Sequence, residues 1–233
     1  MSPIPADVRQ LLLVLADDWG SIAGSLVRFV RAEAGGAWQA AGQPLAVSLG
    51  RAGLAWGRGW QPAEAASGPR KREGDGRAPA GVFPITALFG QGGPEGEVAR
   101  SAKLPYLQAT ADLKCVDDPA SRHYNRVVDQ SRVVPDWQSC EDMQRGDHRY
   151  EVGAVLGCNC EPVVPGAGSC LFLHVWAAPG APTAGCTAMA REDMLALARW
   201  LDGRARPVLV QLPRAEYGRL RDRWGLPLLT AAA

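Results

Sequence analysis

Apolar residues near the start of the chain recur at steps of three and four, which is the period of an amphipathic helix. The residues on this pattern are Val8, Leu11, Leu12, Leu15, Leu26, Phe29 and Val30. The pattern predicts one or two helices over residues 6–33, and a glycine-rich stretch at residues 35–43 then interrupts it. We therefore expect residues 1–44 to be a helical segment packed on a domain that residues 45–233 form.

The rest of the chain alternates short apolar runs with turn-forming residues, a pattern typical of strands. Residues 50–53 are predicted as a hairpin turn between the first two runs. The runs predict strands at residues 45–49, 54–56, 82–87, 152–156, 171–176 and 207–212.

Two helical elements are predicted among these strands. Residues 191–202 place apolar positions on one face, with acidic residues early and Arg199 late, as the helix dipole favours. Gly203 is the expected terminator of this helix. Residues 137–143 are predicted as a capped helical turn with Ser139 as the N-cap. Many short strands and few helices together indicate a β-rich α+β domain.

Composition narrows the classes of partner. The chain has 233 residues, of which 47% are hydrophobic, enough to fill a sizeable core. Its 25 basic and 24 acidic residues leave a net charge of +1, which gives no electrostatic reason to bind nucleic acid or an anionic membrane. No apolar run approaches the roughly 20 residues of a membrane-spanning helix. One catalytic domain with long loops is the simplest expectation, and two small domains are the alternative.

The start of the chain lacks the features of a secretory leader. Residues 1–16 have neither a basic first segment nor a small-residue cleavage site, and Asp17 and Asp18 end the apolar run at once. The chain is therefore expected either in the cytosol or as a mature form from which a leader has been removed.

The cysteines bear on the compartment. The chain has six: Cys115, Cys140, Cys158, Cys160, Cys170 and Cys186. With Cys186 set aside, the other five fit two disulfides and one free thiol in an oxidising compartment. We expect Cys115 to pair with Cys140, and Cys170 with Cys158 or Cys160. Reduced buried thiols are one alternative. A zinc site of Cys158, Cys160, Cys170 and His174 is another, although its one-residue cysteine gap is unusual for zinc.

The stretch from Cys170 to Met189 carries the strongest chemical signal. His174 lies inside an apolar run, and Cys186 follows after a loop of Ala, Pro and Gly. A thiol with a pKa of about 8.5 is little ionised at neutral pH, and an imidazole within hydrogen-bond reach can remove its proton. The pair predicts a cysteine nucleophile with His174 as general base and later acid. The carbonyl of Val175 is the candidate that orients the imidazole.

Gly185 adds a possible oxyanion hole to this pair. Without a Cβ it can adopt a positive φ, which would let the amides of Gly185 and Cys186 converge on one point. A structural interpretation stands beside the catalytic one. A lone cysteine is often a small buried hydrophobe, and a histidine in an apolar run is often a satisfied core residue.

This stretch resembles the active-site signature of the YkuD-type L,D-transpeptidases, in which a His precedes a loop that ends in Ser/Thr-x-Gly-Cys. The matching residues are His174, Thr183, Gly185 and Cys186. A second segment is similar to one that precedes a core strand in this family, and its residues are Glu73, Gly74, Asp75, Gly76, Pro79, Gly81 and Phe83. The resemblance covers about residues 45–212. It implies a β-sandwich-like catalytic core with the cysteine at one side of a cleft.

Two positions depart from the family pattern. Ala184 stands where many members have a His directly before the Gly, and Ala188 stands where many have an Arg two residues after the Cys. Because that Arg is the usual carboxylate-binding residue of the family, the departure bears on substrate choice more than on the nucleophile.

The resemblance implies acyl transfer between peptidoglycan stem peptides through a thioester on Cys186, in the bacterial cell envelope (periplasm). It implies no metal and no organic cofactor, and it makes β-lactams of the carbapenem class the expected covalent inhibitors. Water as acceptor would instead make the protein an amidase, carboxypeptidase or peptidase. A non-catalytic wall-binding module, with His174 and Cys186 as relics, is the third hypothesis.

Polar and aromatic residues around the motifs are candidates for binding the substrate. They are Thr183, Trp176, Ser169, Tyr124 and Asn125. The last two belong to a polar cluster at residues 117–125 that also contains two adjacent aspartates. Adjacent carboxylates on a strand point to opposite faces, so we interpret the aspartates as part of a structural turn near the cleft.

Overall fold

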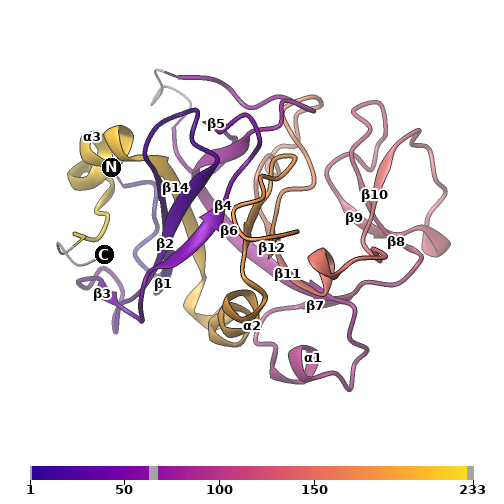
Figure 1. The fold of residues 1–233 in the computed structure, drawn as a ribbon, viewed down its shortest axis with the longest axis horizontal. Coiled ribbons are helices and arrows are strands. Elements are labelled where there is room, and N and C mark those ends of the chain that lie inside the picture. Colours follow the sequence, from indigo (N-terminus) through magenta and orange to yellow (C-terminus); the bar gives the residue numbers. More distant parts are fainter. Residues whose placement is uncertain (1, 63–67, 230–233) are drawn as a thin grey trace.

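The computed structural model describes residues 2–62 and 68–229 (Figure 1). The α-helices in this part of the chain are α1 (Glu97–Ser101), α2 (Arg191–Trp200) and α3 (Arg214–Trp224), and 3₁₀ turns cover Gln130–Arg132, His148–Tyr150 and Gly203–Ala205. The strands are β1 (Gln10–Ala16), β2 (Ala23–Val30), β3 (Gln39–Ala40), β4 (Leu45–Ser48), β5 (Leu54–Trp56), β6 (Ala78–Gly90), β7 (Tyr106–Gln108), β8 (Leu113–Val116), β9 (Val127–Asp129), β10 (Cys140–Asp142), β11 (Val152–Leu156), β12 (Phe172–Val175), β13 (Thr187–Met189) and β14 (Val208–Pro213).

Most strands belong to one sheet in the order β1-β14-β6-β11-β12-β13-β4-β2-β3. Because β1 also pairs with β2, the path returns to its first strand and forms a closed, barrel-like ring. Every residue of β1 and β14 is buried, which makes these strands the centre of the main apolar core. The predicted β-rich α+β class is confirmed. The sandwich-like core that the family resemblance implies stays a prediction.

The N-terminal segment is the largest departure from the sequence-based expectation. Residues 6–33 contain β1 and β2 rather than helices. β1 pairs in parallel with β14 and antiparallel with β2. All its residues are buried, and its sequence is continuously apolar from Leu11 to Ala16. Short runs of this kind fit a buried strand as well as a helix, and here the tertiary pairing decides.

The division of the chain between residues 44 and 45 stays a prediction. The N-terminal strand β2 pairs with β4 across this boundary, over the register Ala23–Ser48 to Leu26–Leu45. The second part of the division also includes residues 63–67 and 230–233, which lie outside the described residues.

Later elements follow the sequence more closely. β4, β5, β6, β11, β12 and β14 lie at the six predicted strands. The predicted turn also forms, since Gly53 N donates to Gly50 O at 2.8 Å, although β5 pairs with β6 and not with β4. α2 occupies the predicted helix but ends at Trp200, before Gly203. α3 has no counterpart in the sequence prediction.

The predicted helical turn at residues 137–143 is wrong, because Cys140–Asp142 is the strand β10. Ser139 caps no helix there and donates its hydroxyl to Asp117 at 2.6 Å. Asp118 accepts backbone hydrogen bonds from Ala120 and Gln138. The two adjacent aspartates therefore fix a turn, as the sequence predicts.

A separate sheet of three strands, in the order β10-β8-β9, lies beside the ring, at the right of Figure 1. Its β8 carries Cys115, which forms a disulfide with Cys170 in the segment before β12. Both expected disulfides are therefore wrong, and Cys140, Cys158 and Cys160 are free thiols. Spacing alone does not fix pairing. The zinc alternative also loses Cys170 as a thiolate ligand.

The two longer helices pack against the ring. α2 contacts β11 and β12, and α3 contacts β14 and β1. Among the helices of the described residues, none has both the length and the apolar character that crossing a bilayer requires.

Candidate active site

His174 and Cys186 come together because β12 and β13 are neighbouring parallel strands. In their register Leu173 pairs with Thr187 and His174 with Ala188, and Cys186 is the residue directly before β13. Both side chains line one cavity of about 100 Å³. The structure thus gives the predicted nucleophile and base a shared opening.

The imidazole of His174 is oriented by the backbone. Its Nδ1 lies 2.7 Å from the carbonyl oxygen of Val175. A carbonyl only accepts, so Nδ1 carries the proton and Nε2 is the basic nitrogen. His174 is only 6% exposed, and its burial lowers the pKa of the imidazole to about 4. The ring is therefore neutral at pH 7, with Nε2 unprotonated.

Cys186 is held by the strand beside it. Its Sγ accepts a hydrogen bond from Phe172 N at 3.3 Å and donates toward Cys170 O at 3.6 Å. Burial raises the pKa of the Cys186 thiol. The resting site therefore contains a neutral thiol beside a neutral imidazole. An ion pair would form only as a reaction begins, because burial penalises the charged forms of both groups.

Thr183 and Gly185 shape the backbone before the sulfur. Gly185 has a φ of +153°, and a Cβ there would lie 3.2 Å from the carbonyl oxygen of Arg77. Thr183 Oγ1 donates to Cys186 O at 2.6 Å and accepts from Gly185 N at 3.1 Å. In this conformation the Gly185 amide is already used. Of the two amides predicted to hold an oxyanion, that of Cys186 is left for the role.

We predict that Thr183→Val lowers the free energy of unfolding by about 1–2 kcal/mol, because an isosteric side chain leaves the Cys186 carbonyl and the Gly185 amide without their partner. The acylation rate of Cys186 should fall as well, since the backbone that carries the sulfur is less fixed. Urea unfolding measures the free energy of unfolding, and time courses of Cys186 acylation measure the rate. Thr86→Val is the matched control, because Thr86 is exposed and makes only a 3.4 Å hydrogen bond to Val155 O. Equal losses in the two variants would contradict the prediction.

Three other substrate-binding candidates form hydrogen bonds in and around the segment before β12. Ser169 Oγ donates to Glu73 Oε2 at 2.7 Å, and the Tyr124 hydroxyl donates to the same oxygen. Asn125 donates to Cys158 O at 2.9 Å and accepts from Cys170 N at 3.0 Å. These three residues lie outside the lining of the Cys186–His174 cavity in the described part of the chain.

Trp176 also lies outside that lining. Its carbonyl oxygen is 2.9 Å from Nε2 of His148, and its amide donates to Met189 O. Thr183 is the one substrate-binding candidate among the described residues that line the cavity.

The second motif forms a turn that lies against the backbone just before Cys186. Asp75 pairs with Lys71 at 2.5 Å and accepts from the backbone amide of Arg77. Gly74 and Gly76 have φ values of +68° and +66°, a region that favours glycine. The carbonyl of Arg77 is the group that a Cβ on Gly185 would meet. The two motifs that the sequence singles out are therefore adjacent.

Four titratable residues that line the cavity carry no motif in the sequence. They are Glu141, Arg145, Arg149 and Tyr150. The Tyr150 hydroxyl donates to Glu141 Oε1 at 2.7 Å, and its ring lies 5.3 Å from that of His174. Burial raises the pKa of both Glu141 and Tyr150. The mixed charges in this part of the sequence are typical of a solvated turn. Only the three-dimensional arrangement identifies these four residues as part of the cavity.

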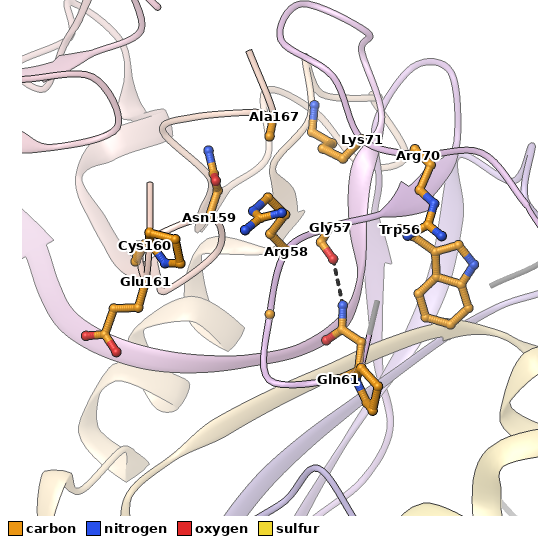
Figure 2. Close-up of a pocket in the computed structure, with 13 residues that line it drawn as sticks. Trp56, Gly57, Arg58, Gln61, Arg70, Lys71, Asn159, Cys160, Glu161 and Ala167 are labelled. Carbon is orange, nitrogen blue, oxygen red and sulfur yellow. Dashed lines mark hydrogen bonds between the residues drawn. The ribbon is translucent and has the colours of Figure 1, made fainter. Parts of the chain in front are cut away.

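A second and larger cavity, of about 340 Å³, lies beside β5 (Figure 2). Arg58, Lys71 and Asn159 are among the side chains around it. Lys71 is already paired with Asp75, and Asn159 donates to Val164 O and Gly168 O. Cys160 supplies a thiol to the lining of this second cavity, but among the described residues no histidine lines it. This cavity therefore lacks the thiol–imidazole pair of the first.

A thiol and an imidazole with a free basic nitrogen, at one cavity, are the groups that nucleophilic catalysis by cysteine uses. The family model of the YkuD L,D-transpeptidase catalytic domain matches residues 38–210, which is 173 of 233 residues (210 − 38 + 1). The chain therefore belongs to the YkuD family of L,D-transpeptidase catalytic domains, which act on peptidoglycan peptides. No match was found among the curated proteins. No match was found among the solved structures.

The buried histidine predicts a loss of stability in acid. The pKa of His174 is about 4 in the folded chain, below the ordinary histidine value of 6.5. As the pH falls below 6.5, the unfolded chain binds a proton at this residue and the folded chain does not. Stability is therefore lost between about pH 6.5 and pH 4, by up to about 3 kcal/mol.

Urea unfolding at several pH values measures this loss. His174→Gln should flatten the curve in this window. His148→Gln, at an exposed histidine, should keep the wild-type slope. The same slope in all three proteins would exclude a strongly depressed pKa at His174.

Proposed function

We propose that the chain is an L,D-transpeptidase that forms cross-links between peptidoglycan stem peptides through a thioester on Cys186. The observation that carries the proposal is the shared cavity of Cys186 and His174, where Val175 O fixes the imidazole and leaves Nε2 as the base. Membership of the YkuD family supports the reaction class.

In the first half of the reaction, His174 Nε2 takes the proton of the Cys186 thiol as the sulfur attacks the carbonyl of an L-centre in the donor stem. The Cys186 amide stabilises the oxyanion of the tetrahedral intermediate. The bond to the departing D-amino acid breaks, and the imidazolium returns its proton to the leaving amine. A thioester on Cys186 and a neutral His174 result.

In the second half, the amine of an acceptor stem attacks the thioester carbonyl. His174 accepts a proton from the attacking amine and gives it to the departing sulfur. The new amide bond is the cross-link, and the site returns to its neutral resting state. A metal or an organic cofactor has no part in these steps.

Muropeptide analysis tests this proposal. The purified chain is incubated with muropeptides that carry tetrapeptide stems, and the products are separated and weighed by mass spectrometry. New cross-linked dimers are expected from the wild type and none from Cys186→Ala. Shortened or detached stems without dimers would make the protein a hydrolase. Unchanged muropeptides would favour the non-catalytic wall-binding module.

We further propose that the chain works in the bacterial cell envelope, in the periplasm. Its proposed substrate lies there, and the Cys115–Cys170 disulfide fits an oxidising compartment. Cell fractionation with a thiol-trapping gel shift tests this. An oxidised protein in the envelope fraction is expected, and a reduced protein confined to the cytosol would contradict the proposal.

A further inference from the structure

Two arginines lie in the cavity of Cys186 and His174 without a role in the acyl transfer just described. Arg145 and Arg149 both belong to the segment between β10 and β11, and both line the cavity. We propose that they form an anion subsite that binds a free carboxylate of the acyl donor next to the reacting carbonyl. This inference rests on the proposed function and names what that site recognises.

The strand that carries the nucleophile does not supply this charge. Ala188, two residues after Cys186, is fully buried in β13 and pairs with His174 on one side and Ser48 on the other. Any cation that faces the substrate beside Cys186 therefore comes from another element. The segment between β10 and β11 is the element that brings two guanidinium groups to the cavity.

Asp147 holds both arginines and leaves them capacity for a ligand. It accepts hydrogen bonds from Arg149 Nε and Nη2 at 2.9 and 2.5 Å, and it lies 3.4 Å from Arg145 Nε. The hydrogen bonds from Arg149 lower the pKa of Asp147, so it stays charged. A guanidinium has five N–H donors, and Asp147 accepts from two on Arg149. Asp147 itself is not part of the cavity lining.

The other titratable groups of the cavity do not cancel the two cations. His174 is neutral, and the thiol of Cys186 and the phenol of Tyr150 are protonated because burial raises their pKa values. Glu141 is the acidic group in the lining, and burial raises its pKa as well. Its carboxyl accepts from Tyr150 and lies 4.0 Å from Arg145. Among the described residues, the lining therefore holds two guanidinium groups against one carboxyl, and this excess of positive groups favours an anion.

A pair of alkylating reagents probes the subsite at the sulfur. Iodoacetate carries a carboxylate and iodoacetamide is its neutral analogue, and both react with thiols. Peptide mass spectrometry follows alkylation of Cys186 separately from Cys140, Cys158 and Cys160, which are also free. The iodoacetate-to-iodoacetamide rate ratio at Cys186 should fall about tenfold in Arg149→Gln and in Arg145→Gln, because each removes a charge-assisted contact.

Three further variants make the outcome specific. Arg149→Lys should restore much of the ratio, because it keeps the charge. Arg191→Gln, at an arginine paired with Glu151 and Glu192 outside the cavity lining, should leave the ratio unchanged. Thermal melts check that each variant is folded. Cys186→Ser should give no label at residue 186.

Each outcome decides between the proposals. An unchanged ratio with Cys186 still labelled would overturn the anion subsite and leave the nucleophile intact. Equal slowing with both reagents would show a structural role for the arginines and would also overturn it. If neither reagent labels Cys186 in the wild type, the proposal of an accessible nucleophile is contradicted, and the proposal of an anion subsite is contradicted with it.

Discussion

His174→Gln is expected to slow the acylation of Cys186 by about a thousandfold. Positioned general bases contribute roughly 10²–10⁴ in rate, and glutamine has no basic nitrogen to replace Nε2. Burial strengthens the effect, because the raised pKa of the Cys186 thiol leaves almost no spontaneous thiolate at neutral pH. Time-resolved mass spectrometry of the adduct with a carbapenem measures the rate.

His148→Gln is the matched control for this variant. His148 is exposed, contacts Trp176 O, and does not line the cavity, so its loss should change the rate by less than about threefold. If His174→Gln acylates at the wild-type rate, the thiolate forms by another route and the base has been assigned wrongly.

Replacing Cys115 and Cys170 together by serine is expected to lower the free energy of unfolding by about 4 kcal/mol. The disulfide joins residues 55 positions apart, and a cross-link over such a loop restricts the unfolded chain by roughly that amount. It also ties the three-stranded sheet to the segment whose carbonyl, at Cys170, faces the Cys186 sulfur. Acylation of Cys186 should therefore slow as well. Urea unfolding and the carbapenem time course measure the two effects.

The free thiols supply the control for the disulfide variant. Cys140→Ser with Cys160→Ser removes two cysteines that are not bridged and should cost much less. A reductant should lower the stability of the wild type and of this control, and leave the Cys115→Ser/Cys170→Ser protein unchanged. Equal stability of the two double variants would contradict a tethering role.

The sequence predicts the later strands of this fold well and the first two badly, for one physical reason. In β11, β12 and β14, apolar runs are short and bounded by turn formers, so length separates strand from helix. In β1, the run from Leu11 to Leu15 is followed by a second apolar stretch at a spacing that a helix would also produce. What makes it a strand is pairing with β14, almost two hundred residues later.

The candidate site is likewise predicted from the sequence only in part. The sequence identifies Cys186, His174 and Gly185 because their motif is local. It also places Val175 beside the imidazole, since adjacent residues must be close. It does not predict the partner of Cys170, nor the approach of Arg145 and Arg149. These depend on how the three-stranded sheet lies against the ring, and no spacing in the chain encodes that contact.

Three polar candidates near the motif make hydrogen bonds within the chain, and their binding of substrate stays a prediction. Tyr124 and Ser169 both donate to Glu73, and Asn125 bridges the segments at Cys158 and Cys170. Each carries the hydrogen-bonding groups of a ligand site. In the structure those groups satisfy buried backbone and carboxylate partners, which is the commoner use of such residues.

The most direct test of a Cys186 thioester is intact-protein mass spectrometry after exposure to a carbapenem, followed by peptide mapping. The wild type should gain one adduct, located on Cys186 and released by neutral hydroxylamine, as expected of a thioester. The folded Cys186→Ala protein should gain none. An adduct that persists in Cys186→Ala, or that maps to another residue of the wild type, would contradict the assignment of this sulfur as the nucleophile.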